Sequence, residues 1–251
     1  MGLTLSSRLS LRLAGGAGWT PAALGSSLLG WWDAERTDKL TLSGSSVSTW
    51  TDVVGGYAAT QGVSGSKPSW DANAFGGRPG VIFDGADDEL TLGSVPFPVG
   101  ANASEIWALV DQQAPGADVN TRAFFTYGDV TNTSRRAQRY STGGANRLQS
   151  VVGSGAANVG ADVIADFSGR CVARVIVSGT DTTAAVNGTS GSAQAVIPST
   201  ATSRTRLGAT SASTAANFWQ GQINTVIVTN PLSTGQAAQL LAYLKARGGI
   251  A

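Results

Sequence analysis

Four acidic side chains lie within the short segment Asp84-Gly85-Ala86-Asp87-Asp88-Glu89. Carboxylate oxygens are ligands that calcium favours, so Asp84, Asp87 and Asp88 are weak candidates for a calcium site. The segment lacks the spacing of an EF-hand loop, and acidic residues in turns commonly bond their own backbone. We therefore expect a structural turn with no metal and no cofactor, and no rise in melting temperature when calcium is added.

The sequence contains few other residues that are candidates for catalysis. The chain has no histidine and one cysteine, Cys171, which excludes Ser-His-Asp and Cys-His catalysis as well as a disulfide within the chain. A glycosidase would need two carboxylates on either side of the bond that it cleaves. The strand-like run from Glu105 to Asp111 has apolar residues between its two acids. We expect a protein that is not an enzyme, with glycoside hydrolysis as an alternative.

Aromatic rings offer a second kind of site, because a sugar can stack on an exposed ring. Most tryptophans of this chain lie in apolar, strand-like contexts, where packing in the core is their usual role. Trp70 lies in a polar segment that we expect to be a loop. Trp70 and Tyr140 are therefore the candidate glycan contacts, and core packing is the competing interpretation for the aromatic residues as a group.

The elements that must position these residues are predicted to be short strands. The chain has 251 residues, 33 of them glycine, and only 13% of its residues are charged. That composition is typical of one large all-β domain with many tight turns. The net charge of +1 gives no electrostatic reason to bind nucleic acid. No apolar run reaches the roughly 18–20 residues that cross a bilayer, so no membrane insertion is expected.

Local patterns place most of these elements. Alternating or continuous apolar runs predict strands at 28–34, 47–52, 81–83, 90–92, 106–110, 123–127, 137–140, 148–152, 171–177, 182–186, 205–208 and 222–228. One helix is expected near the C-terminus, because Ser233 and Gln236 form a capping box and Gly248 is a typical helix stop. Its predicted apolar stripe consists of Ala237, Leu240, Leu241 and Leu244.

Residues 1–18 have a pattern of their own. Leucines fall on odd positions and arginines on even ones, which predicts an extended segment with one apolar edge, followed by a glycine-rich hinge. The segment is either an ordinary first strand or an arm that docks on a partner. We expect an arm and hinge at 1–18 and a single domain at 19–251. The predicted partner-binding residues of the arm are Leu3, Leu5, Arg8, Leu9, Leu11, Arg12 and Leu13.

Several pieces stand in a recognisable order: Leu28-Leu29-Gly30-Trp31-Trp32-Asp33-Ala34, then Gly80 to Leu90, Asn187-Gly188, and Phe218-Trp219-Gln220-Gly221. This order resembles the laminin-G-like, concanavalin A-like lectin/glucanase domains of tailed-phage structural proteins. The resemblance implies an all-β fold: a two-sheet antiparallel jelly-roll sandwich with one C-terminal helix, here with an extended N-terminal arm. Hydrolases with this fold carry a Glu-x-Asp-x-x-Glu strand, which is missing here.

The resemblance also implies a function. We expect a non-enzymatic virion structural protein of a tailed phage, as a capsid decoration, head fibre or tail appendage attached through its arm. Its expected partners are capsid or tail subunits, with homo-oligomers or multivalency from virion symmetry, and its expected location is the virion. Adhesion to a host-surface glycan is a further expectation. The alternatives are a free carbohydrate-binding, lectin-like module and a glycoside hydrolase.

Overall fold

The computed structural model describes residues 18–93, 95–112, 122–128, 135–141, 147–153, 158–163, 169–201, 204–210 and 215–251. At 135–141 and 158–163, and at 147, 149, 151 and 153, it describes the backbone alone. The predicted arm, with Leu3, Leu5, Arg8, Leu9, Leu11, Arg12 and Leu13, lies outside the described residues. Its role stays a prediction.

One layer of the molecule is an antiparallel sheet built around the long strand β18 (Gln220–Thr229). One edge of β18 pairs with β8, which pairs with β13 and then with β14; the other edge pairs with β1 and β6. These neighbours are β8 (Ser104–Gln112), β13 (Gly169–Val177), β14 (Asp181–Val186), β1 (Leu28–Asp33) and β6 (Gly80–Asp84). Short strands extend the two sides: β5 (Ser69–Asp71) beside β6, and β15 (Thr189–Ser190) and β16 (Gln194–Ala195) beside β14.

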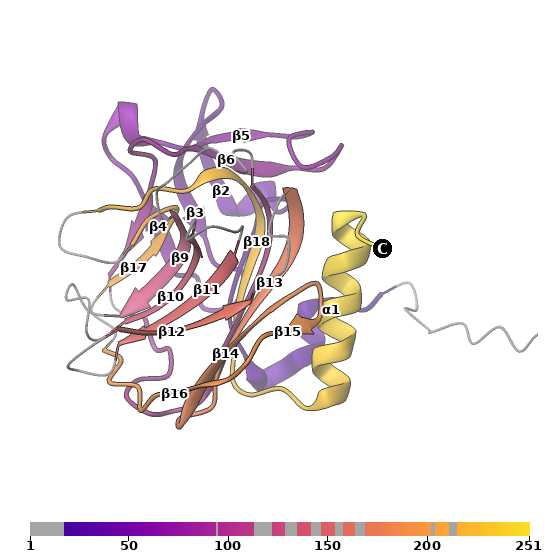
Figure 1. Cartoon of the computed structure of the whole chain (residues 1–251). Coiled ribbons are helices and arrows are strands. Elements are labelled where there is room, and N and C mark those ends of the chain that lie inside the picture. Colours follow the sequence, from indigo (N-terminus) through magenta and orange to yellow (C-terminus); the bar gives the residue numbers. More distant parts are fainter. Residues whose placement is uncertain are drawn as a thin grey trace, which may run out of the picture.

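The second layer is also antiparallel and lies opposite the first (Figure 1). Its pairing order is β2, β3, β4, β7, β17, β9, β10, β11 and β12. The bounds are β2 (Leu40–Ser43), β3 (Ser46–Thr51), β4 (Ala58–Thr60), β7 (Leu90–Leu92), β17 (Arg204–Leu207), β9 (Arg122–Gly128), β10 (Arg135–Ser141), β11 (Arg147–Gly153) and β12 (Asn158–Val163). Three short 3-10 helices complete the connections: η1 (Pro21–Ser27), η2 (Thr37–Lys39) and η3 (Ser64–Ser66).

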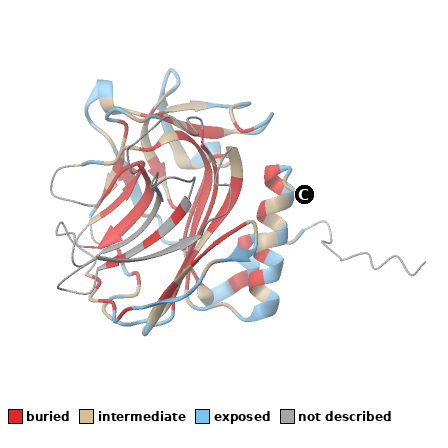
Figure 2. Ribbon diagram, in the orientation of Figure 1, coloured by how far each residue is buried: buried red, intermediate tan, exposed pale blue. Residues whose placement is uncertain are grey.

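The hydrophobic core fills the space between the two layers. Buried residues run along the facing strands (Figure 2). Trp32 on β1 reaches Phe125 on β9, with 5.9 Å between the ring centroids. Strand alternation divides β8, so that Ile106 and Ala108 belong to this core while Trp107 belongs to a second cluster on the other face. The first sheet is therefore covered on both sides.

The helix α1 (Thr234–Gly248) covers the outer face of the first sheet (Figure 1). Ser233 and Gln236 form the predicted capping box, and Leu240 and Leu244 are buried against the sheet. The helix ends one residue later than expected, because Gly249 and not Gly248 takes the left-handed conformation, with φ of 63°. No helix among the described residues is long and apolar enough to cross a membrane.

The predicted fold class is confirmed: an all-β sandwich of two antiparallel layers with one C-terminal helix. Cys171 is buried in the core, as a small apolar residue would be. The sequence analysis did not predict the six-residue strand β12 or the shorter strands β2, β4, β5, β15 and β16. Trp70 consequently lies on β5 and not in a loop. Strands of two or three residues, such as β4, β5, β15 and β16, are too short to show a period of two.

Candidate functional site

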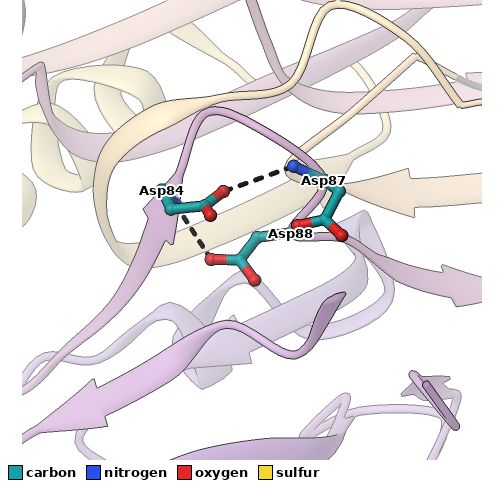
Figure 3. Close-up of side chains that lie close together, drawn as sticks. All are labelled: Asp84, Asp87 and Asp88. Atoms are coloured by element: carbon teal, nitrogen blue, oxygen red, sulfur yellow. Dashed lines mark hydrogen bonds between the residues drawn. The ribbon is translucent and has the colours of Figure 1, made fainter. Parts of the chain in front are cut away.

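The acidic turn, residues 84–89, connects β6 to β7 at one edge of the sandwich, and its carboxylates hold its backbone. Asp84 Oδ1 accepts hydrogen bonds from the backbone N–H groups of Ala86, at 2.8 Å, and Asp87, at 3.3 Å. Asp88 Oδ2 accepts one from the N–H of Asp84, at 2.9 Å (Figure 3). The predicted structural turn is therefore present, with its acids bonding their own backbone.

Two other segments fix the turn from outside. Ser66, at the end of η3, donates its hydroxyl to Asp87 Oδ2 at 2.9 Å. Arg122, the first residue of β9, donates from Nη1 to the carbonyl of Gly85 at 3.1 Å. Gly85 has a φ of +81°, and a Cβ there would lie 2.3 Å from Arg122 Nη1, so glycine is required at this position. The carboxylates are thus held on a braced loop.

The three carboxylates of Asp84, Asp87 and Asp88 converge. One oxygen of each lies within 4.8 Å of those of the other two. Asp84 and Asp87 are exposed, whereas Asp88 is buried, with 7% of its surface exposed. Burial, together with the neighbouring charges of Asp84 and Asp87, raises the pKa of Asp88 from 3.8 to about 6, against the opposing effect of its bond to the N–H of Asp84.

This arrangement has three chemical capabilities. Converging carboxylate oxygens can hold a cation, accept hydrogen bonds from hydroxyl groups, and, at Asp88, supply a proton near neutral pH. The structure thus brings the three weak calcium candidates together, and the expected absence of a metal stays a prediction. Glu89 does not join them, because it forms an ion pair with Arg206 at 2.7 Å.

The two candidate glycan contacts are not part of this turn. Trp70 is half-buried on β5, packs against the core, and donates its indole N–H to the carbonyl of Ala34 at 3.0 Å. The side chain of Tyr140, on β10, lies outside the described residues. Glycan contact at either residue stays a prediction.

A second group of functional side chains was not expected from the sequence. Trp107 and Arg174 line a pocket of about 290 Å³ between α1 and the first sheet, and both donate hydrogen bonds to Glu105. Strand alternation places Glu105 and Trp107 on one face of β8, but no pattern shows that β13 pairs with β8 and brings Arg174 opposite Trp107. Pairing between distant strands was the missing information.

No protein-family model matches the chain, and no curated protein matches its sequence. Solved structures do share the fold. An arabinofuranosidase complexed with arabinofuranosyl-α-1,2-xylobiose is 13% identical, with a TM-score of 0.60, over 88% of this chain and 59% of that one. Domain 4 of AbnA, a GH43 extracellular arabinanase from Geobacillus stearothermophilus, in complex with arabinotriose, is 12% identical, with a TM-score of 0.58, over 86% of this chain and 98% of that one.

A third similar structure is the Trypanosoma rangeli sialidase in complex with sialic acid. It is 14% identical, with a TM-score of 0.58, over 88% of this chain and 33% of that one. The chain thus spans 59% of the arabinofuranosidase and a third of the sialidase, but nearly all of the arabinanase domain. At these identities the likeness shows a shared β-sandwich fold.

The expectation of a non-enzymatic virion protein is wrong. The solved structures named above come from glycoside hydrolases, which favours the glycoside hydrolase alternative, and nothing among them supports a phage protein. The broader lectin/glucanase-like β-sandwich is compatible with these structures; the phage laminin-G-like assignment has no support. The error has a physical reason: the motifs that carried it are strand and turn signals, which specify a fold and not its task. The predicted partners, oligomerisation and location remain predictions.

Proposed function

We propose that this chain is a carbohydrate-active domain of the glycoside hydrolase class, and that it holds a saccharide at the acidic turn. The observation that carries the proposal is the convergence of the Asp84, Asp87 and Asp88 carboxylates at the surface, within 4.8 Å of one another. Saccharides present several hydroxyl donors close together. A group of fixed carboxylate oxygens is a strong acceptor for them, because a hydrogen bond with one charged partner is about twice as strong as a neutral one.

The three residues would have different roles. Asp84 uses Oδ1 to hold the turn, and its exposed carboxylate has a second oxygen for a ligand. Asp87 is exposed and oriented by Ser66. Asp88 is buried beneath them and bonded to the N–H of Asp84. Binding would therefore involve mainly Asp84 and Asp87, with Asp88 as their support.

The comparisons support this proposal at the level of the whole domain. The arabinanase domain has nearly the same extent as this chain, and its structure holds arabinotriose. Arabinotriose is therefore a reasoned first probe. The arabinofuranosidase and the sialidase are longer than this chain, which covers 59% and 33% of them. For this reason a substrate and a hydrolytic activity of this protein remain proposals.

Hydrolysis at the same turn is a second candidate, favoured by the raised pKa of Asp88. A carboxyl group with a pKa of about 6 is protonated in a fraction of the molecules near neutral pH, and in that form it can protonate a glycosidic oxygen. An exposed carboxylate of Asp84 or Asp87 would then attack the anomeric carbon or stabilise its positive charge. The carboxylate oxygens lie within 4.8 Å of one another, which is closer than the roughly 6.5–9.5 Å between the carboxyl groups of inverting glycosidases.

Calorimetric titration with arabinotriose tests the binding proposal. Asp84→Asn and Asp87→Asn should each weaken binding by at least about tenfold, because each removes a charged acceptor. Asp71→Asn, at the exposed end of β5, is the matched control and should leave affinity unchanged. The proposal is wrong if wild-type protein binds none of arabinotriose, xylobiose and sialic acid, or if the control weakens binding as much as the two variants.

Release of reducing sugar from arabinan, followed across pH, tests the hydrolysis candidate. Asp88→Asn should abolish release while leaving arabinotriose binding within a few-fold, since the asparagine Oδ1 can still accept the bond from Asp84. Activity that persists in Asp88→Asn would exclude Asp88 as the proton donor.

A further inference from the structure

The pocket under α1 is a second site, separate from the acidic turn. It has a volume of about 290 Å³ and lies between the N-terminal half of the helix and the outer face of β13 and β14. Figure 1 shows this half of α1 beside β14 and β15. Its walls are mainly apolar, and the helix contributes Ala237, Ala238 and Leu241. The volume is near the lower end of the range for small-molecule sites.

One wall of the pocket is a fixed guanidinium group. Arg174 stacks on the ring of Trp107, with its Cζ 4.4 Å from the ring centroid. Its Nε and Nη2 both donate to Glu105 Oε2, at 3.1 and 3.0 Å. The stacking and the two bonds to Glu105 hold the group in one orientation. The side chain keeps 22% of its surface exposed, and among the described residues that line the pocket Arg174 is the one with a charge.

The acid that neutralises Arg174 is withdrawn from the pocket. Glu105 has only 4% of its side chain exposed. Besides Arg174, it accepts hydrogen bonds from Trp107 Nε1, at 2.9 Å, and from the backbone N–H of Leu232, at 3.1 Å. Its two oxygens are thus occupied by four donors. The guanidinium edge that carries Nη1 makes no hydrogen bond among the residues that the structure describes.

The electrostatic balance at the pocket is positive. Arg174 and Glu105 carry opposite unit charges, while Thr234, the first residue of α1, also lines the pocket. The N-terminus of a helix acts as a positive charge of about one half. A bound group with negative charge therefore meets a net attraction, and an apolar body would rest on Leu241 and the helix alanines.

We propose that this pocket binds a small monocarboxylate with a short apolar body, whose carboxylate pairs with Nη1 of Arg174. This inference does not depend on the saccharide proposal, because the two sites share no residue. A cationic ligand of the same shape would be repelled by Arg174, and a neutral one would lose the charged hydrogen bond.

Hexanoate is the test ligand, with hexan-1-ol and hexylamine as probes of the same length. Titration of the full chain, followed by the NMR signal of the Trp107 indole N–H, should show binding of hexanoate. Hexan-1-ol should bind at least about tenfold more weakly, because it lacks the charged hydrogen bond. Equal affinity for the acid and the alcohol would overturn the assignment of a carboxylate, and no binding of hexanoate would overturn the site.

Two variants locate the binding. Ala238→Phe places a large ring in the pocket from an exposed helix position and should abolish hexanoate binding. Ala246→Phe, exposed on the same helix and outside the pocket, is the matched control and should bind as the wild type does. Hexanoate binding that survives in Ala238→Phe would place the ligand elsewhere and contradict the proposal.

A third variant covers the case in which Ala238→Phe does not fold. Arg174→Lys keeps a cation beside Glu105 but lacks the planar second edge, so it should fold and bind hexanoate more weakly. Unchanged affinity in a folded Arg174→Lys protein would contradict the role of Nη1. Asp84→Asn, in the acidic turn, should leave hexanoate binding unchanged, which separates failure of this inference from failure of the saccharide proposal.

Discussion

Arg247 in the last turn of α1 and Asp33 at the end of β1 form a buried ion pair, although 214 residues separate them in the sequence. Arg247 Nη1 donates to Asp33 Oδ2 at 3.0 Å, Nη2 donates to Oδ1, and each side chain keeps 5% of its surface exposed. Tyr243, one turn earlier, accepts a further bond from Nη1 at 2.8 Å. The pair fixes the C-terminal half of the helix on the first sheet.

Removal of this arginine should be costly. Arg247→Met leaves Asp33 buried without its partner, and we expect the free energy of unfolding to fall by about 3–5 kcal/mol. Urea denaturation measures the change. Arg36→Met is the control, because Arg36 and Asp38 form an exposed pair whose loss should cost at most about 1 kcal/mol. Equal losses in the two variants would contradict the importance of burial.

Asp88 should make stability depend on pH. Its folded pKa of about 6 lies above its ordinary value of 3.8, so the folded state binds the proton more tightly than the unfolded state does. The stabilisation from this group is therefore complete below pH 3.8 and is lost as the pH rises through 6, by up to about 3 kcal/mol. Urea denaturation at several pH values should show the loss in wild type and a smaller one in Asp88→Asn. Parallel curves would refute a raised pKa.

Calcium should have little effect on stability, as the sequence predicted. The acidic turn is already held by hydrogen bonds from Ala86, Asp87 and Ser66. Its three carboxylates, each bound through one oxygen, would leave half or more of the six to eight positions around calcium unfilled. Differential scanning calorimetry with millimolar calcium should give the same melting temperature as with EDTA. A rise of several degrees that EDTA reverses would instead identify the acidic turn as a cation site.

Asp52 should matter for stability more than a surface acid does. It is fully buried after β3 and accepts hydrogen bonds from the backbone N–H groups of Trp31, Val54 and Gly55. Asp52→Ala leaves these donors without partners, at about 1–3 kcal/mol for each donor that stays buried. Asp71→Ala removes one exposed bond, to Asn73, and should cost well under half as much in the same denaturation assay. Similar costs would show that water replaces Asp52.

The sequence predicted local structure better than long-range pairing. The runs around Val81, Ile106 and Val175 are strands because alternation and β-branched residues act within a few positions, and Ser233 with Gln236 marks the helix start for the same reason. The acidic turn was visible because its residues are neighbours in the chain.

The contacts between distant segments had no local signal. The pairing of β13 with β8 brings Arg174 to Glu105 across 69 residues, and Arg247 reaches Asp33 only through the packing of α1 on the sheet. Burial of Asp88, which raises its pKa, likewise depends on the assembled sandwich. These features follow from tertiary structure, which the pattern of one strand or helix does not contain.

An NMR titration of the full chain with arabinotriose, followed through the backbone amide signals, tests most directly whether the acidic turn holds a saccharide. We expect the signals of Asp84, Ala86 and Asp87 to shift in proportion to bound saccharide, and these shifts to disappear in the combined Asp84→Asn and Asp87→Asn variant. Shifts confined to other parts of the sandwich, or none at saturating arabinotriose, would contradict the acidic turn as the saccharide site.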